Sequence, residues 1–172
     1  MTVGQTPSQT VGPYFALGLF AQKADELVTV GSSGAIQVSG HVLDGAAEPV
    51  PDAIVEVWQA DEAGRYRTDF GWGRSGCDAD GRFSFITVKP GRVANGSVEW
   101  QAPHLMLMVF ARGLLKPVLT RMYFPDEEEA NAQDPVLSAV DDGSSLVARP
   151  TGDGLVFDVR LQGEGETVFF AV

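Results

Sequence analysis

Side chains that bind transition metals are scarce in this sequence. Its 172 residues include two histidines, His41 and His104, and one cysteine, Cys77. One cysteine excludes a disulfide within the chain, and the Cys and His spacing of a zinc site is absent. A metal held by this chain alone would need oxygen ligands from tyrosine or carboxylate side chains. The sequence therefore argues against a transition-metal site built from this chain alone.

Basic residues and long apolar runs are also few. The chain has 12 lysines and arginines against 23 aspartates and glutamates, which gives a formal net charge of −11. Nucleic acids and anionic membranes attract positive surfaces, so neither is an expected partner. No run approaches the ~18 apolar residues that cross a bilayer. The first residues lack the basic and apolar regions of a secretion signal, which favours a cytoplasmic location.

What is present is a series of short strand patterns. Hydrophobic residues make up 44% of the chain, and its length suits one domain. Alternating or continuous apolar runs occur at residues 36–42, 54–58, 83–85, 155–161 and 167–170. Asp-Gly or Asn-Gly pairs at 44–45, 80–81, 95–96, 142–143 and 153–154 predict tight turns with positive φ. Together they predict an all-β fold, an antiparallel β-sandwich, with one short helix near residues 125–130.

The first 30 residues differ from this pattern. They contain few strand signals and include Pro7, Gly12 and Pro13, so we expect an extended N-terminal arm at 1–30 on a sandwich core at 31–172. Several of the arm's large side chains are apolar and need a surface to pack against. They are Tyr14, Phe15, Leu17, Leu19 and Phe20.

One predicted strand, residues 104–110, carries a partial metal-binding pattern. Residues i and i+2 of a strand project from the same face, so a His-x-His pair can direct two imidazoles at one ion. Here His104 is followed by Met106, so the second imidazole is replaced by a thioether. Met106 and Met108 are predicted to fill the core.

Several segments together resemble the intradiol ring-cleaving dioxygenases. They are residues 6–15, 49–61, 64–67, 80–85, 89–91 and 121–127. Within that family the resemblance is to non-catalytic α chains, which assemble with an iron-bearing β chain. It implies an intradiol-type β-sandwich with an N-terminal arm, in a higher oligomer of αβ units. It also implies the reaction of the complex, which cleaves protocatechuate with O2 to 3-carboxy-cis,cis-muconate.

The resemblance also identifies which metal ligands are missing. Catalytic chains of the family hold a non-haem Fe(III) ion through two tyrosines and two histidines. Tyr66 and His104 match one of each, whereas Val93 and Met106 stand at the other two positions. A thioether is a poor ligand for ferric iron. We therefore expect a vestigial site here, iron held by the partner β subunit, and no catalytic or metal-binding residue in this chain.

One further difference from the catalytic pattern concerns a positive charge, and the two matching residues have ordinary structural roles to consider as well. Gln101 replaces an arginine that follows a tryptophan in the catalytic pattern, here Trp100. Outside a metal site, Tyr66 is expected to be a core or subunit-contact aromatic whose hydroxyl is hydrogen-bonded. His104 is expected to be a packed, neutral histidine.

The resemblance further implies a substrate pocket shared with the β subunit. Four arm residues would line it, and a guanidinium would attract the carboxylate of protocatechuate. These residues are Thr10, Gly12, Pro13, Tyr14 and Arg121. Two plainer interpretations stay open, since the arm can be a subunit clamp and Arg121 can belong to an ion pair.

Two other functions also stay open. The chain can be a stand-alone β-sandwich binding module that has lost catalysis. It can also be a self-sufficient enzyme in which Tyr66 and His104 combine with carboxylates. Visible colour separates the last possibility from the others, because tyrosinate bound to ferric iron absorbs visible light.

Overall fold

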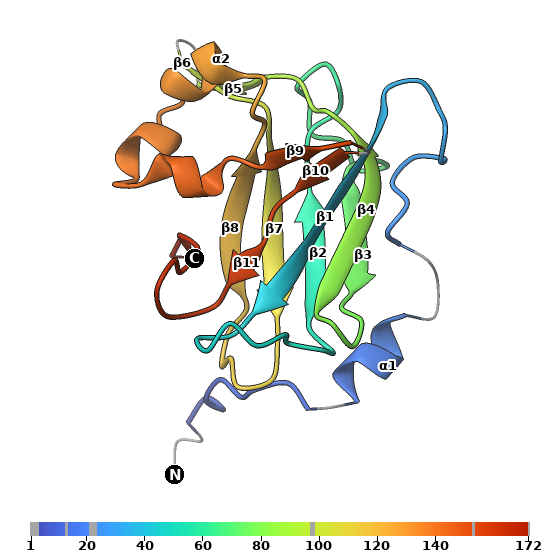
Figure 1. Cartoon of the computed structure of the whole chain (residues 1–172), viewed down its shortest axis with the longest axis vertical. Coiled ribbons are helices and arrows are strands. Elements are labelled where there is room, and N and C mark those ends of the chain that lie inside the picture. The colour runs from blue at the N-terminus through green and yellow to red at the C-terminus, as the bar shows by residue number, and fades with distance from the viewer. Residues whose placement is uncertain (1–3, 13, 21–23, 97–98, 153, 172) are drawn as a thin grey trace.

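Two β-sheets pack face to face to form a sandwich (Figure 1). The computed structural model describes residues 4–12, 14–20, 24–96, 99–152 and 154–171. The first sheet is antiparallel throughout, in the order β3-β2-β7-β8. Its strands are β2 (Ile54–Trp58), β3 (Trp72–Gly76), β7 (His104–Phe110) and β8 (Val118–Tyr123).

The second sheet is built around one long strand. Its strands are β1 (Ala35–Leu43), β4 (Arg82–Val88), β9 (Arg149–Thr151), β10 (Gly154–Val156) and β11 (Val159–Arg160). β4 pairs antiparallel with β1, whereas β10 and β11 pair with β1 in parallel. The predicted β-sandwich is confirmed, with these two short parallel pairings added to its antiparallel ladders.

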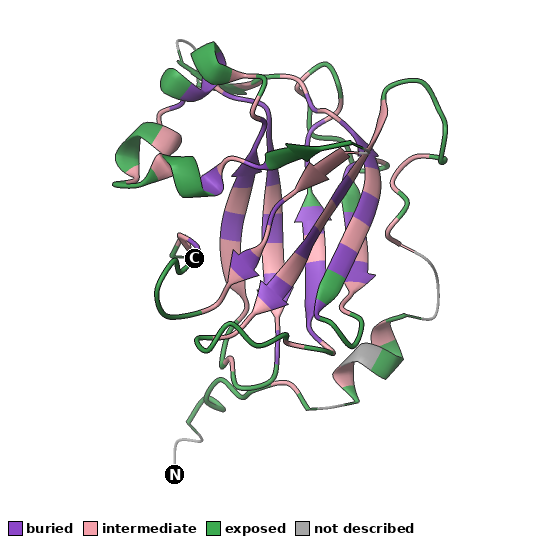
Figure 2. Cartoon of the chain, viewed as in Figure 1, coloured by how far each residue is buried: buried purple, intermediate pink, exposed green. Residues whose placement is uncertain are grey.

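The core lies between the sheets and follows the period of two that strands impose. In β7, Leu105, Leu107 and Val109 are fully buried. Figure 2 shows the resulting alternation of buried and half-buried positions along the central strands. Met106 and Met108 are half-buried and alternate with these core residues, so they face outward and the prediction that they fill the core is wrong. Because both faces of this strand are apolar, its sequence did not reveal which one packs inside.

Several strand boundaries differ from the predictions. The run at 155–161 is divided between β10 and β11, and the run at 167–170 contributes one isolated bridge, between Phe170 and Leu119. A short hairpin, β5 (Val93–Asn95) and β6 (Glu99–Gln101), precedes β7. The helix predicted from acidic residues is present as α2 (Glu128–Ala132). Two 3-10 helices follow it, η1 (Leu137–Ala139) and η2 (Gly143–Leu146).

The predicted glycine turns are partly confirmed. Gly81 and Gly96 have φ of 73° and 72°. The other three pairs do not place their glycine at positive φ. In the 44–48 turn a non-glycine residue, Ala47, takes that conformation with φ of 64°. Gly143 and Gly154 instead begin η2 and β10.

The arm passes beneath the sandwich and then along one of its edges (Figure 1). It contains a short helix, α1 (Phe15–Leu19), which the sequence did not predict. Further along, Ala24 forms a bridge to Arg74 of β3, and Glu26 forms a bridge to Ile86 of β4. Because β3 and β4 belong to different sheets, the arm closes the edge between them.

Candidate functional site

The two surviving ligand positions of the family pattern lie next to each other. Tyr66 lies in the loop after β2, and its hydroxyl is 3.5 Å from Nε2 of His104 at the start of β7. His104 Nδ1 donates to the Ala102 carbonyl at 2.8 Å, because that oxygen can only accept. Nε2 is then the unprotonated nitrogen and accepts from Tyr66. The Tyr66 ring also stacks on Trp58, with centroids 5.9 Å apart.

The local electrostatics keep both groups neutral at physiological pH. Burial, followed by the nearby Arg121 guanidinium, lowers the pKa of His104 from 6.5 to about 4. His104 is 2% exposed, so it is packed as expected, and the lowered pKa favours its neutral form. Burial raises the pKa of Tyr66 against the opposing effect of Arg121, so its phenol stays protonated. Tyr66 is 42% exposed, so it does not belong to the core.

The residues at the other two ligand positions do not fit a ferric ion. Met106 presents a thioether on the outer face of β7, and Val93 of β5 pairs with Gln101 without offering any donor atom. Over the described ranges, no group of three or more His, Cys, Asp or Glu side chains could hold a metal. Tyr66 and His104 are hydrogen-bonded to each other and lie beside the positively charged Arg121. This constellation therefore does not match the family's iron site.

Arg121 of β8 is that cation. Its Nη1 donates to Oε1 of Gln101 at 2.9 Å and to the Tyr123 hydroxyl at 3.3 Å. The Tyr123 hydroxyl in turn donates to the fully buried carboxylate of Asp134 at 3.1 Å. Burial raises the pKa of Tyr123 to about 12, so this hydroxyl remains a donor. Arg121 is thereby fixed beside Tyr66 and His104.

The arm residues predicted to line the pocket begin at the other end of the β7–β8 hairpin. The Thr10 hydroxyl accepts a hydrogen bond from the Gly113 amide at 2.8 Å, in the loop that joins these strands. The Gly12 carbonyl accepts from Phe15 at 3.1 Å, and Tyr14 is 79% exposed. Pro13, also predicted to line the pocket, lies outside the described residues.

Arg121 is therefore not grouped with the arm within this chain. It pairs with Met106, which is four residues from Phe110 along β7. At about 3.3 Å per residue, this separation is about 13 Å of strand before the loop begins. The arginine adjacent to the Thr10 contact is Arg112, which directly precedes Gly113 in the sequence. Its Nε donates to Asp52 at 2.8 Å. No pattern in the sequence pointed to Arg112, because only the folded arm brings it near Thr10.

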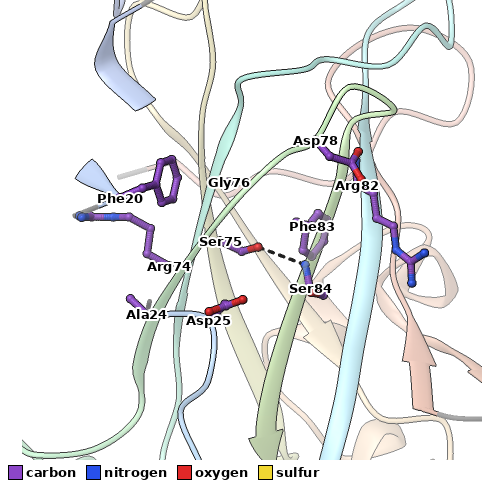
Figure 3. Close-up of a pocket in the computed structure, with 10 residues that line it drawn as sticks. All are labelled: Phe20, Ala24, Asp25, Arg74, Ser75, Gly76, Asp78, Arg82, Phe83 and Ser84. Atoms are coloured by element: carbon purple, nitrogen blue, oxygen red, sulfur yellow. Dashed lines mark hydrogen bonds between the residues drawn. The ribbon is translucent and has the colours of Figure 1, made fainter. Parts of the chain in front are cut away.

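A separate hollow of about 510 Å³ lies where the arm meets β3 and β4 (Figure 3). Phe20 lies beside Gly76, where an added Cβ would come within 2.6 Å of the Phe20 ring. Arg74 donates to Glu56 at 2.8 Å and to the Leu19 carbonyl at 3.4 Å. Since Gly76 and Arg74 both contact the arm, this hollow belongs to the arm's attachment.

Comparison with known proteins identifies the family. A family model described as Dioxygenase matches residues 11–163. The protocatechuate 3,4-dioxygenase alpha chain of Burkholderia cepacia is 42% identical over 99% of both chains. The chain belongs to the intradiol ring-cleaving dioxygenase family. The predicted membership is thus confirmed, and it explains the two-sheet architecture.

Two further relatives extend the intradiol dioxygenase comparison. The protocatechuate 3,4-dioxygenase beta chain of Burkholderia cepacia is 33% identical over 77% of this chain and 66% of its own. A dioxygenase domain from Streptomyces sp. SirexAA-E, part of a carbohydrate-binding fusion, is 30% identical with a TM-score of 0.62. It covers 93% of this chain and 99% of that domain. Intradiol dioxygenases depend on iron, and this chain is similar to both an alpha chain and a beta chain of protocatechuate 3,4-dioxygenase.

The helices are short. Of those in the described residues, none has the length and hydropathy needed to cross a membrane.

Proposed function

We propose that this chain is the non-catalytic α subunit of a protocatechuate 3,4-dioxygenase. The observation that carries the proposal is the incomplete ligand set, in which Tyr66 and His104 bond to each other while Val93 and Met106 occupy the other positions. The 42% identity to an alpha chain over nearly the full length supports the same assignment. The reaction would then belong to the complex, in which protocatechuate and O2 give 3-carboxy-cis,cis-muconate.

The partner in this proposal is the β subunit, which would hold the Fe(III) ion. A β-chain relative at 33% identity indicates that both subunits descend from one fold. Iron would supply activation of the bound catechol towards O2. This chain would contribute the shape and charge of the pocket and the contacts of a higher oligomer of αβ units. With a single cysteine, this chain suits the reducing cytoplasm.

The arm would deliver that contribution. Tyr14 and Leu17 are highly exposed, although large apolar side chains favour burial, so a partner surface is expected to cover them. Gly12 has no side chain and would let the backbone come close to the substrate, and the Tyr14 ring would offer a face and a hydroxyl. Thr10 fixes the start of this segment through Gly113.

The cation that would attract the substrate carboxylate is better placed at Arg112 than at Arg121. Arg112 precedes the glycine that binds Thr10, whereas Arg121 lies at the other end of the hairpin. The Arg112 side chain is 57% exposed and bonds to Asp52 through Nε. A partner carboxylate or substrate can therefore reach the rest of its guanidinium.

Co-expression tests this assignment. The chain is produced alone and together with the family β chain from the same source, and iron content, visible colour and protocatechuate-dependent O2 uptake are measured. We expect a colourless, inactive chain alone and a coloured, active complex. Iron and turnover in the isolated chain would instead mean that it is a self-sufficient enzyme. A stable monomer that never associates with the β chain would favour the stand-alone binding module.

A further inference from the structure

Asp52 holds a carboxylate in an unfavourable setting. It lies in the turn before β2 with φ of 68°, and it is one of two non-glycine residues with positive φ in the described chain. Its Oδ1 is buried and has no hydrogen-bond partner among the described residues, whereas its Oδ2 forms an ion pair with Arg112. A strained backbone and an unpartnered buried oxygen both reduce stability. The retention of an aspartate here therefore points to a role beyond stability.

Strand register brings Asp52 and Arg112 together. Ile54 at the start of β2 pairs with Phe110 at the end of β7. Asp52 precedes Ile54 by two residues, and Arg112 follows Phe110 by two. Because the strands are antiparallel, both residues lie at the same end of the sheet. The ion pair is thus set by the sheet and does not depend on the position of the arm.

The ion pair engages one side of the Arg112 guanidinium. Its Nε lies 2.8 Å from Oδ2 of Asp52, and the side chain is 57% exposed. A guanidinium presents its donors in a rigid plane, so a contact at Nε limits how that plane can turn. The two terminal nitrogens are then available to a second carboxylate, which can bind them side by side. The next residue, Gly113, donates its amide to Thr10 of the arm at 2.8 Å.

We propose that Asp52 is a positioning residue that orients Arg112 towards the carboxylate of the substrate. This inference rests on the proposed function, in which Arg112 attracts that carboxylate at the pocket shared with the β subunit. Asp52 holds the Nε side of the guanidinium, and the bond between Gly113 and Thr10 holds the following residue against the arm. The terminal nitrogens can therefore meet the substrate carboxylate without first losing rotational freedom. Asp52 itself touches no reacting atom.

Steady-state kinetics of the co-expressed αβ complex tests this role with two substitutions. Asp52→Gly removes the carboxylate and suits the positive φ, whereas Asp52→Asn suits it too and keeps an oxygen that can accept from Nε. We expect Asp52→Gly to raise KM for protocatechuate by about fivefold, with kcat and iron content unchanged. Asp52→Asn should give a KM between that of the parent and that of Asp52→Gly. Ala47→Gly is the matched control, because Ala47 also has positive φ, at 64°, but carries no charge.

Three further measurements separate orientation of Arg112 from a general loss of structure. In the Arg112→Gln background, Asp52→Gly is expected to cause no further rise in KM, because no guanidinium remains to be oriented. With catechol, which has no carboxylate, Asp52→Gly should leave KM unchanged. Protocatechuate binding without O2, followed by the visible absorption of the complex, should be weaker in Asp52→Gly than in Ala47→Gly.

Two results would overturn the proposal. One is an unchanged KM for protocatechuate in Asp52→Gly when Arg112→Gln raises it. The other is an equal rise in KM for protocatechuate and catechol, which would mean that the pocket is disturbed as a whole. If Arg112→Gln has no effect, the role of Arg112 fails and that of Asp52 fails with it. Iron and turnover in the isolated parent chain would instead overturn the α-subunit assignment, and this result is read before any variant is made.

Discussion

At the scale of single residues, the chain replaces metal ligands with internal hydrogen bonds and one cation. His104 keeps the buried position and fixed tautomer that suit a ligand, but its free nitrogen faces the Tyr66 hydroxyl. The neighbouring positive charge is the Arg121 guanidinium, and Met106 turns a soft sulfur to the same face. A site that would bind Fe(III) through anionic oxygens has therefore become one that would repel it.

The depressed pKa of His104 predicts a stability change with pH. The unfolded chain protonates this imidazole below pH 6.5, whereas the folded chain does so only near pH 4. Its contribution to the free energy of unfolding is therefore fully present above pH 6.5 and is lost as the pH falls towards 4. Between pH 7.5 and pH 5 the loss is about 2 kcal/mol. Urea unfolding at the two pH values should give a smaller difference for His104→Gln, and an identical difference would contradict the assigned shift.

The arginines at the two ends of the β7–β8 hairpin should have different effects on catalysis. In the assembled complex, Arg112→Gln is expected to raise KM for protocatechuate by roughly tenfold, because a charge-assisted hydrogen bond is lost. Arg121→Gln is expected to leave KM and iron content unchanged. Steady-state O2 uptake and iron analysis measure both. A KM increase confined to Arg121→Gln would restore the role first predicted for that residue.

At the scale of elements, β1 depends on close backbone contacts. At Gly40 an added Cβ would lie 1.8 Å from the Phe157 carbonyl oxygen and 2.9 Å from the Phe83 ring. The Phe157 amide also donates to the Ser39 carbonyl at 2.8 Å, which holds the segment between β10 and β11 beside β1. Only a residue without a side chain permits β10 and β11 to run along β1.

Gly40→Ala is therefore expected to destabilise the fold by about 3 kcal/mol, because neither backbone segment can move away. Gly152→Ala is the control, since nothing lies within 4 Å of its added Cβ. That change is expected to fall within about 0.5 kcal/mol of the parent. Thermal or urea unfolding of both variants measures the difference, and similar stabilities would refute the close contact.

At the scale of the whole molecule, the arm is attached at several points yet leaves apolar surface uncovered. Thr10, Phe20 and Ala24 connect it to the β7–β8 loop, Gly76 and β3. Helix α1 nevertheless exposes Leu17 to the extent of 76%. The attached side secures the arm to its own chain, and the exposed side is available to a partner.

Leu17→Asp is accordingly expected to weaken assembly with the β chain by about tenfold or more, since it puts a charge into an apolar contact. The thermal stability of the chain should stay the same, because this side chain already faces solvent. Val30→Asp is the control, as Val30 is 64% exposed outside the helix. Analytical ultracentrifugation of co-expressed pairs compares them, and equal assembly of both variants would count against a partner-covered arm.

The sequence by itself determined the family, the β-sandwich and the loss of two ligands. Those properties depend on residue identity and on local alternation, as at Val93, at Met106 and in β2. Tertiary structure alone decided that Met106 faces outward, that Arg121 bonds to Gln101, and that Arg112 lies beside the Thr10 contact. The reason is that facing and proximity follow from strand register and from the path of the arm. Both are set by contacts between residues far apart in the chain, which no local pattern records.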